Sequence, residues 1–155
     1  MAAFSRRYLA LGAARKGMLS LAIREFGRIR LRAVIYAVHV SISAAQAGRF
    51  YQEVILHQQV WGIRDSGGFP APVTGGGVRS MPFWSLRSGA EKVISSVAAY
   101  RDFEVEAIPL AVWRTRWIDG LDRDGILVGL NWSGVRATGY DFQPLEVRAG
   151  LEARE

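Results

Sequence analysis

The stretch that decides the fold is Asp124 to Trp132, which reads Asp-Gly-Ile-Leu-Val-Gly-Leu-Asn-Trp. The Asp124-Gly125 pair is a turn signal, and Ile126 to Leu130 is apolar throughout apart from Gly129. A short apolar run bounded by turn residues predicts a strand that is covered on both faces, in the interior of a sheet. Because glycine has no side chain, Gly129 predicts that a ring or a backbone segment lies close to this strand.

Two helices are predicted upstream of this strand from apolar residues that recur at i, i+3, i+4 and i+7. The first is expected to start at a capping box in residues 43–46 and to end near His57. Its apolar stripe consists of Ala47, Phe50, Tyr51 and Val54. The second is expected to start at a capping box in Ser88 to Glu91. Its buried stripe consists of Ala90, Val93, Ile94 and Val97.

Three further strands are predicted before the central strand, and the first and third of them show alternating apolar and polar residues. They cover Val60 to Asp65, Ser80 to Trp84 and Phe103 to Ile108. The first two are expected to pair with each other across the loop Ser66 to Gly77, which contains five glycines and two prolines. The third is expected to be half exposed, because Glu104 and Glu106 alternate with its apolar residues.

The segments around the central strand complete the predicted fold. Pro109 is favoured in the first turn of a helix, and the helix that it opens is expected to bury four apolar side chains. These are Leu110, Trp113, Trp117 and Leu121. Gly134 and Gly139 predict a turn and a returning edge strand through Tyr140 to Phe142, after which Pro144 starts a final helix. This order predicts an α+β (mixed α/β) fold, with a single mixed sheet of four to five strands and helices packed on it.

The first 40 residues differ in charge from the rest of the chain. Residues 1–40 contain eight arginines and lysines and one glutamate, whereas residues 41–155 contain 12 basic and 13 acidic residues. Leu19, Ile23 and Phe26 share one helical face while arginines occupy another, which is a basic amphipathic pattern. We therefore predict a basic amphipathic N-terminal extension over 1–40, folded weakly or not at all, and a single globular domain over 41–155.

The extension also bears on location. No apolar run approaches the roughly 20 residues of a membrane-spanning helix, and no clear cleavage site follows an apolar stretch. An arginine-rich, acid-poor leader also resembles an organelle transit peptide in composition. The chain has no cysteine, which excludes disulfides and thiolate chemistry. We expect a cytoplasmic protein without a transmembrane segment.

Five blocks of sequence carry a resemblance to a known family. They are Phe-Tyr-Gln-Glu-Val at 50–54, Val-Trp-Gly-Ile-Arg-Asp leading into Gly-Phe-Pro-Ala-Pro at 60–72, Met-Pro-Phe-Trp-Ser at 81–85, Ala-Glu-Lys-Val-Ile at 90–94, and the stretch from Asp-Gly to Asn-Trp-Ser-Gly at 124–134. In order and spacing they resemble an uncharacterised bacterial family, the domain of unknown function 2750. The resemblance covers Ser43 to about Glu152 and leaves Met1 to Val40 without a counterpart. It implies a fold unit and no established activity.

Combinations of residues that would predict a catalytic or metal centre are missing from the sequence. Asp122 to Gly125 is similar to part of a calcium loop, but the aspartate that should open the loop and the glutamate that should close it are missing. His39 and His57 have no second ligand at helical or hairpin spacing. Ser85 and Ser133 lack a nearby histidine base. We therefore predict no metal, no cofactor and no catalytic residues.

Polar and aromatic residues gather at the predicted strand ends. Asn131 and Trp132 follow the central strand at its carboxyl end, where open α/β sheets place binding crevices. Trp84 and Ser85 end another strand, just before a helix whose first-turn amides can receive an acceptor. If the two strands are parallel neighbours, these residues share one rim, with an arginine to supply charge. The predicted binding residues are Trp61, Arg64, Arg79, Trp84, Ser85, Asn131 and Trp132. The alternatives are core packing for each tryptophan and a turn cap at Asn131.

Three functions follow as hypotheses. The first is a small non-enzymatic module that binds a protein or peptide through its tryptophan-rich strand ends. The second is a hydrolase or transferase that uses Asp65, Arg64, Arg79 and Asn131 in one pocket, with a carboxylate in a cleft. The third is binding to an anionic membrane or nucleic acid through the basic extension. The near-neutral remainder of the chain lacks the positive charge that nucleic-acid binding requires.

Overall fold

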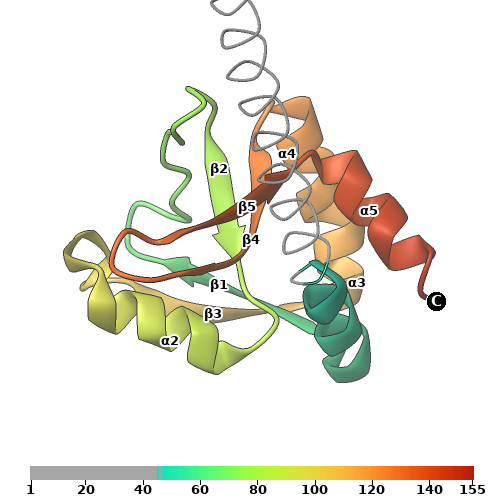
Figure 1. The fold of residues 1–155 in the computed structure, drawn as a ribbon, viewed down its shortest axis with the longest axis horizontal. Coiled ribbons are helices and arrows are strands. Elements are labelled where there is room, and N and C mark those ends of the chain that lie inside the picture. Colours follow the sequence, from blue (N-terminus) through green and yellow to red (C-terminus); the bar gives the residue numbers. More distant parts are fainter. Residues whose placement is uncertain (1–44, 46) are drawn as a thin grey trace, which may run out of the picture. The chain divides into compact units, whose positions relative to one another are not determined.

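The computed structural model describes residues 45 and 47–155, which belong to the compact unit Ser43–Glu155. Figure 1 shows helices and strands combined in an α+β fold, as the sequence predicts. The predicted extension over Met1 to Val40 lies outside the described residues, and so do the Ser43 and Gln46 side chains of the first predicted capping box. Among the residues that are described, no helix is long and apolar enough to cross a membrane.

In the part of the chain that the structure describes, five strands form two sheets, whereas the sequence predicts a single sheet. One sheet pairs β1 (Gln59–Arg64) with β3 (Glu104–Pro109) in antiparallel register. The other sheet has the order β2 (Ser80–Phe83), β4 (Leu127–Ser133), β5 (Thr138–Phe142). Its β2 and β4 strands are parallel, and its β4 and β5 strands are antiparallel. The number of strands and their mixed pairing are as predicted, and the separation into two sheets is not.

The separation arises because little of β2 is free to pair with β1. All four β2 residues pair with β4, and the preceding loop contacts the start of β2, where the Ser80 amide donates to the Pro72 carbonyl at 3.0 Å. Among the described residues of this segment, the backbone hydrogen bonds to β1 come from Trp84, just past β2. It forms one bridge with Trp61 through two backbone hydrogen bonds of 2.8 Å each. The predicted pairing of 60–65 with 80–84 is thus reduced to this bridge.

The predicted central strand is the middle strand of the three-stranded sheet. Val128 and Leu130 are fully or almost fully buried, and β4 lies between β2 and β5. A Cβ atom added to Gly129 would lie 2.4 Å from Nε1 of Trp132, and one added to Gly139 on β5 would lie 2.5 Å from Cδ1 of the same ring. The indole of Trp132 therefore lies directly over two glycines, which confirms the close approach predicted at Gly129.

The first described helix and α2 carry the predicted buried stripes. Residues 47–57 are helical, and Phe50 and Val54 are fully buried. Helix α2 (Arg87–Ser96) buries Ala90 and Val93. The capping box predicted at Ser88 to Glu91 is wrong, because the helix begins before Ser88 and the Glu91 carboxylate accepts from Nε of Arg87 at 2.7 Å instead. A Cβ atom added to Gly89 would lie 2.9 Å from Cδ1 of Trp84, so the first turn of this helix packs closely on the Trp84 ring.

The helix predicted after Pro109 is interrupted by a wider turn. Pro109 ends β3 and caps α3 (Leu110–Val112), which continues through the π-helical turn η2 (Trp113–Trp117) into α4 (Ile118–Arg123). The predicted apolar side chains face the interior, and the rings of Trp113 and Trp117 contact Phe83 with centroids 5.3 and 5.7 Å apart. Helix α5 (Pro144–Glu152) closes the chain after a capping box between Gln143 and Glu146.

Two clusters of buried side chains form the core. The larger one surrounds Phe50, Phe83 and Trp113 and includes residues of α3, α4 and α5. The smaller one lies between α2, the β1–β3 sheet and the carboxyl end of β4, and it contains Trp84 and Trp132. Both tryptophans are among the predicted binding residues, so the smaller cluster packs beneath the carboxyl ends of β2 and β4, where these residues lie.

Candidate functional site

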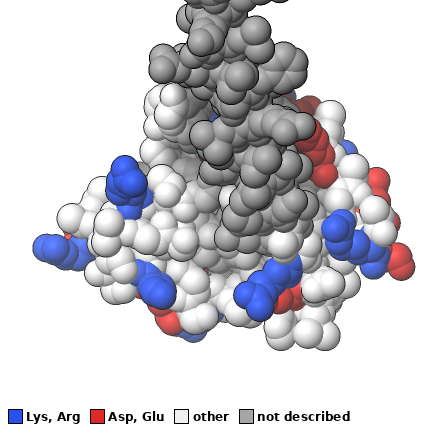
Figure 2. Space-filling model, viewed as in Figure 1, with Lys and Arg blue, Asp and Glu red and all other residues white. Residues whose placement is uncertain are grey.

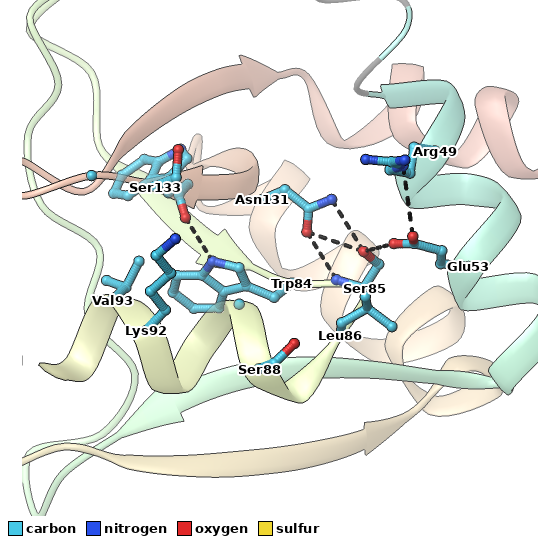
Figure 3. Close-up of a pocket in the computed structure, with 13 residues that line it drawn as sticks. Arg49, Glu53, Trp84, Ser85, Leu86, Ser88, Lys92, Val93, Asn131 and Ser133 are labelled. Carbon is cyan, nitrogen blue, oxygen red and sulfur yellow. Dashed lines mark hydrogen bonds and ion pairs between the residues drawn. The ribbon is translucent and has the colours of Figure 1, made fainter. Parts of the chain in front are cut away.

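The carboxyl ends of β2 and β4 meet at one hollow. Because the two strands are parallel and Phe83 pairs with Leu130, the residues that follow each strand lie at the same end of the sheet. The hollow has a volume of about 230 Å³ and is bounded by the first described helix, α2 and the end of β4, as Figure 3 shows. We call it the α2–β4 hollow. Four predicted binding residues line it: Trp84, Ser85, Asn131 and Trp132.

Asn131 and Ser85 hold the two strand ends together. The Asn131 Oδ1 atom accepts the Ser85 amide proton at 3.0 Å, which fixes the amide so that Nδ2 donates to the Ser85 Oγ at 3.1 Å. Asn131 has a φ of +49° at a register shift in the β4–β5 ladder, a conformation that asparagine tolerates better than most residues. The Asn131 side chain therefore has a structural role, which differs from the turn cap that the sequence left open, because its amide bonds to the neighbouring strand end.

A carboxylate that the sequence did not indicate completes this network. The Ser85 hydroxyl lies 2.5 Å from Oε2 of Glu53, a residue of the first described helix. Because Asn131 Nδ2 already donates to Ser85 Oγ, the single hydroxyl proton goes to the carboxylate. The other Glu53 oxygen lies 3.9 Å from Nε of Arg49. Figure 3 shows the four side chains in a row across the hollow.

The two tryptophans form walls of the hollow. The Trp84 indole donates to the Trp132 carbonyl at 2.8 Å, and the Trp132 indole donates to Oδ1 of Asp141 at 3.2 Å. Both residues are almost completely buried, with 1% and 5% of their surface exposed. The core-packing alternative thus describes most of their surface, and a ligand would meet only the edges of these rings.

The open edge of the hollow is basic and apolar. The Arg49 side chain is 79% exposed, and Leu86, just before α2, is 41% exposed. Lys92 is exposed on α2 and also lines the hollow. Within the part of the chain that the structure describes, Lys92 makes no ion pair, so its charge is available to a ligand.

Three predicted site residues lie elsewhere. Trp61 forms a backbone bridge with Trp84 and does not line the hollow, and the guanidinium of Arg87 lies 5.8 Å from the centroid of its ring. Arg64 lines a separate shallow depression beside Asp65. Arg79 donates from Nε to the Ala71 carbonyl at 3.1 Å. Since Arg79 precedes β2 and Trp84 follows it, the four residues of this strand place them at opposite ends, roughly 13 Å or more apart.

Three residues of the hollow could not be recognised from the sequence. Arg49, Glu53 and Lys92 each fall outside an apolar stripe, and that pattern alone predicts a solvent-facing helix position. Of these three, Glu53 has a distinguishing feature in the sequence: it directly precedes buried Val54 and belongs to the Phe-Tyr-Gln-Glu-Val block. A carboxylate at the margin of a buried stripe needs a partner, which Ser85 supplies.

The described residues contain no group of three or more histidine or acidic side chains placed to hold a metal ion. In the partial calcium loop, Asp124 lies 3.6 Å from Nε of Arg123, and Asp119, which precedes the loop, pairs with Arg148. Burial raises the pKa of Tyr51 and of Tyr100, and neither tyrosine lines the α2–β4 hollow. The hollow thus offers hydrogen-bonding groups, a carboxylate and two cations to a ligand.

A comparison with known protein families identifies the domain. The profile of the family described as Protein of unknown function (DUF2750) matches residues 47–151. The chain belongs to this family. The match begins in the first described helix and ends in α5, so the DUF2750 region includes every strand and both sides of the hollow. No curated protein matches the chain. Membership in DUF2750 establishes the domain and leaves its function unknown.

Proposed function

We propose that the DUF2750 domain of this chain is a small non-enzymatic module that binds a peptide segment of a partner protein in the α2–β4 hollow. The observation that carries the proposal is the convergence of Trp84, Ser85, Asn131 and Trp132 on one hollow whose edge bears exposed cations. The proposal keeps the cytoplasmic location and the bacterial source expected from the sequence.

The chemistry of the hollow favours one kind of peptide. Leu86 and the edges of the two indole rings offer apolar contacts, and the exposed Arg49 and Lys92 offer positive charge. A peptide with an apolar residue next to an acidic side chain, or next to its terminal carboxylate, satisfies both features. Peptide recognition commonly combines such an apolar anchor with capture of an anionic group.

Panning of phage-displayed random peptides on the full chain tests this proposal. Peptides selected on the wild type alone are sequenced, synthesised and titrated by fluorescence polarisation against both the wild type and Lys92→Glu. We expect an apolar–acidic consensus whose affinity falls about tenfold in Lys92→Glu, the loss of one charge-assisted contact.

Arg101→Glu is the matched control, because Arg101 is an exposed cation that does not line the hollow. It makes the same charge change and should leave the affinity unaltered. Selection without a consensus, or equal binding to Lys92→Glu and the wild type, would refute the proposal.

The other two hypotheses receive less support. The hydrolase or transferase pocket requires Arg64, Arg79 and Asn131 together, and the structure places them in three different regions. Binding to an anionic surface depends on Met1 to Val40, outside the described residues. On the face of the described domain shown in Figure 2, lysine and arginine side chains are scattered around the periphery and form no basic patch.

A further inference from the structure

Trp132 also lines a second cavity, which shares no other residue with the α2–β4 hollow. This cavity has a volume of about 450 Å³, within the usual range for small-molecule sites. Its walls come from the loop 72–75, from the segment 97–100 that includes the 3-10 helix η1 (Ala98–Tyr100), and from the β4–β5 turn with the start of β5. We call it the Tyr100 cavity.

Tyr100 supplies a buried polar group to this cavity. Only 8% of the residue is exposed, and its ring packs edge-on against Phe103 with centroids 5.3 Å apart. Tyr100 lines the cavity, and its hydroxyl forms no hydrogen bond within residues 47–155. Burial raises the pKa of Tyr100 above its ordinary 10.0, so the hydroxyl keeps its proton at neutral pH. The cavity thus contains an unused hydrogen-bond donor.

One cation and one anion line the same cavity. Arg136, in the β4–β5 turn, is exposed and forms no ion pair or hydrogen bond with the described part of the chain. Asp141 uses Oδ1 to accept from Ser80 Oγ at 2.6 Å and from Trp132 Nε1 at 3.2 Å. Its second oxygen has no partner among residues 47–155. The two charges are therefore both available to a ligand.

The remaining lining is largely apolar. Val97 and Ala137 are partly or fully buried, and Trp132 adds an aromatic side chain to the lining. Val73 is 66% exposed, which is unusual for a valine beside a cavity. An apolar ligand group would cover it and remove apolar surface from water.

We propose that the Tyr100 cavity binds a free amino acid with an apolar side chain. Its carboxylate would meet Arg136 and the Tyr100 hydroxyl, its ammonium group would meet Asp141, and its side chain would lie against Val97 and Trp132. A zwitterion matches both lining charges, whereas a singly charged ligand leaves one of them uncompensated. This inference does not depend on peptide binding in the α2–β4 hollow.

Isothermal titration of the full chain with leucine, phenylalanine, tryptophan, glycine and serine at millimolar concentrations tests the inference. We expect binding of at least one apolar amino acid and weaker or no binding of glycine and serine. N-acetylation or C-terminal amidation of the bound amino acid should each weaken binding about tenfold, because each removes one charge. In a ¹H–¹⁵N spectrum, the ligand should shift the indole N–H signal of Trp132 and leave that of buried Trp113 in place.

Two conservative variants examine the assigned contacts. Arg136→Gln and Tyr100→Phe should each weaken binding about tenfold, since each removes one hydrogen bond to the ligand carboxylate. Arg101→Gln and Tyr140→Phe are the matched controls, because neither residue lines the cavity, and they should bind like the wild type. Three results would overturn the inference: no binding of any amino acid, equal binding of the N-acetyl derivative, or equal affinity of the site variants and their controls. Lys92→Glu should have no effect, which separates this site from the peptide site.

Discussion

Replacing Gly129 with alanine tests the packing of the central strand. The added Cβ atom would lie 2.4, 2.5 and 2.8 Å from Nε1, Cε2 and Cζ2 of Trp132, whereas ordinary contacts are 3.4–4 Å. The ring must therefore move by about 1 Å. Movement away from the sheet presses it into the second core cluster, which includes Ile63 and Trp84, and stretches the 3.2 Å bond to Asp141.

The expected cost follows from these contacts. Overpacking of a filled core typically costs about 1–3 kcal/mol, and a weakened hydrogen bond adds about 1 kcal/mol. Replacing glycine within a strand recovers roughly 0.5–1 kcal/mol of backbone entropy. We therefore expect Gly129→Ala to lower the free energy of unfolding by about 1–3 kcal/mol, and Gly129→Val to lower it at least as much.

Denaturant titration monitored by circular dichroism measures this change, and thermal unfolding should show a Tm lower by roughly 8 °C for a loss of about 2 kcal/mol. Gly75→Ala is the control, because a Cβ atom added there would have no other atom within 4 Å and the φ of Gly75 is not in the left-handed region. In a Trp132→Leu background, Gly129→Ala should cost much less, since the clashing ring is gone. A neutral or stabilising Gly129→Ala in the wild-type background would refute this account of the strand.

Three further predictions concern stability. Asn131→Ala loses both the bonds to Ser85 and a residue suited to positive φ, whereas Asn131→Gly loses only the bonds. In urea titrations we therefore expect the free energy of unfolding to fall by about 2 kcal/mol for alanine and about 1 kcal/mol for glycine. Equal values would show that backbone strain at residue 131 is unimportant. Because burial raises the pKa of Tyr100, the unfolded chain loses its phenolic proton at lower pH than the folded chain, and stability should fall as pH rises past 10.0. Tyr100→Phe should make this decline smaller when urea midpoints are measured from about pH 8 to 11. Deletion of Met1 to Val40 should change the thermal midpoint by only a few degrees, or about 1 kcal/mol, and loss of cooperative unfolding would show that the extension is part of the core.

Much of the fold could be predicted because burial leaves a pattern in the sequence. The stripe through Phe50 and Val54 repeats at the helix period, and the continuous apolar run through Val128 is typical of a strand covered on both faces. The division into two sheets could not be predicted in this way. It depends on which edge of β2 is already occupied, and the Ser80–Pro72 hydrogen bond that occupies it joins two segments without a shared pattern.

Some residues of the candidate site could likewise be predicted from the sequence, and others could not. Trp84 and Asn131 could be placed together because parallel strands bring their carboxyl ends to one edge. Glu53 could not be placed, since its proximity to Ser85 depends on the angle at which a helix packs against the sheet. Arg79 lies away from the α2–β4 hollow because it precedes β2, and a residue before a parallel strand lies at the opposite edge from one that follows it.

The pairing of the strands has a consequence for the order of folding. Of the paired strands, only β4 and β5 are neighbours in the chain, whereas the Ser80 and Leu127 residues that begin the β2–β4 ladder are 47 positions apart. Closing such long loops costs chain entropy before the new contacts repay it, so the local β4–β5 hairpin and the helices can form early. The Trp61–Trp84 bridge requires both sheets to be in place. Its two amides should consequently be the last to gain protection against hydrogen exchange as the chain refolds.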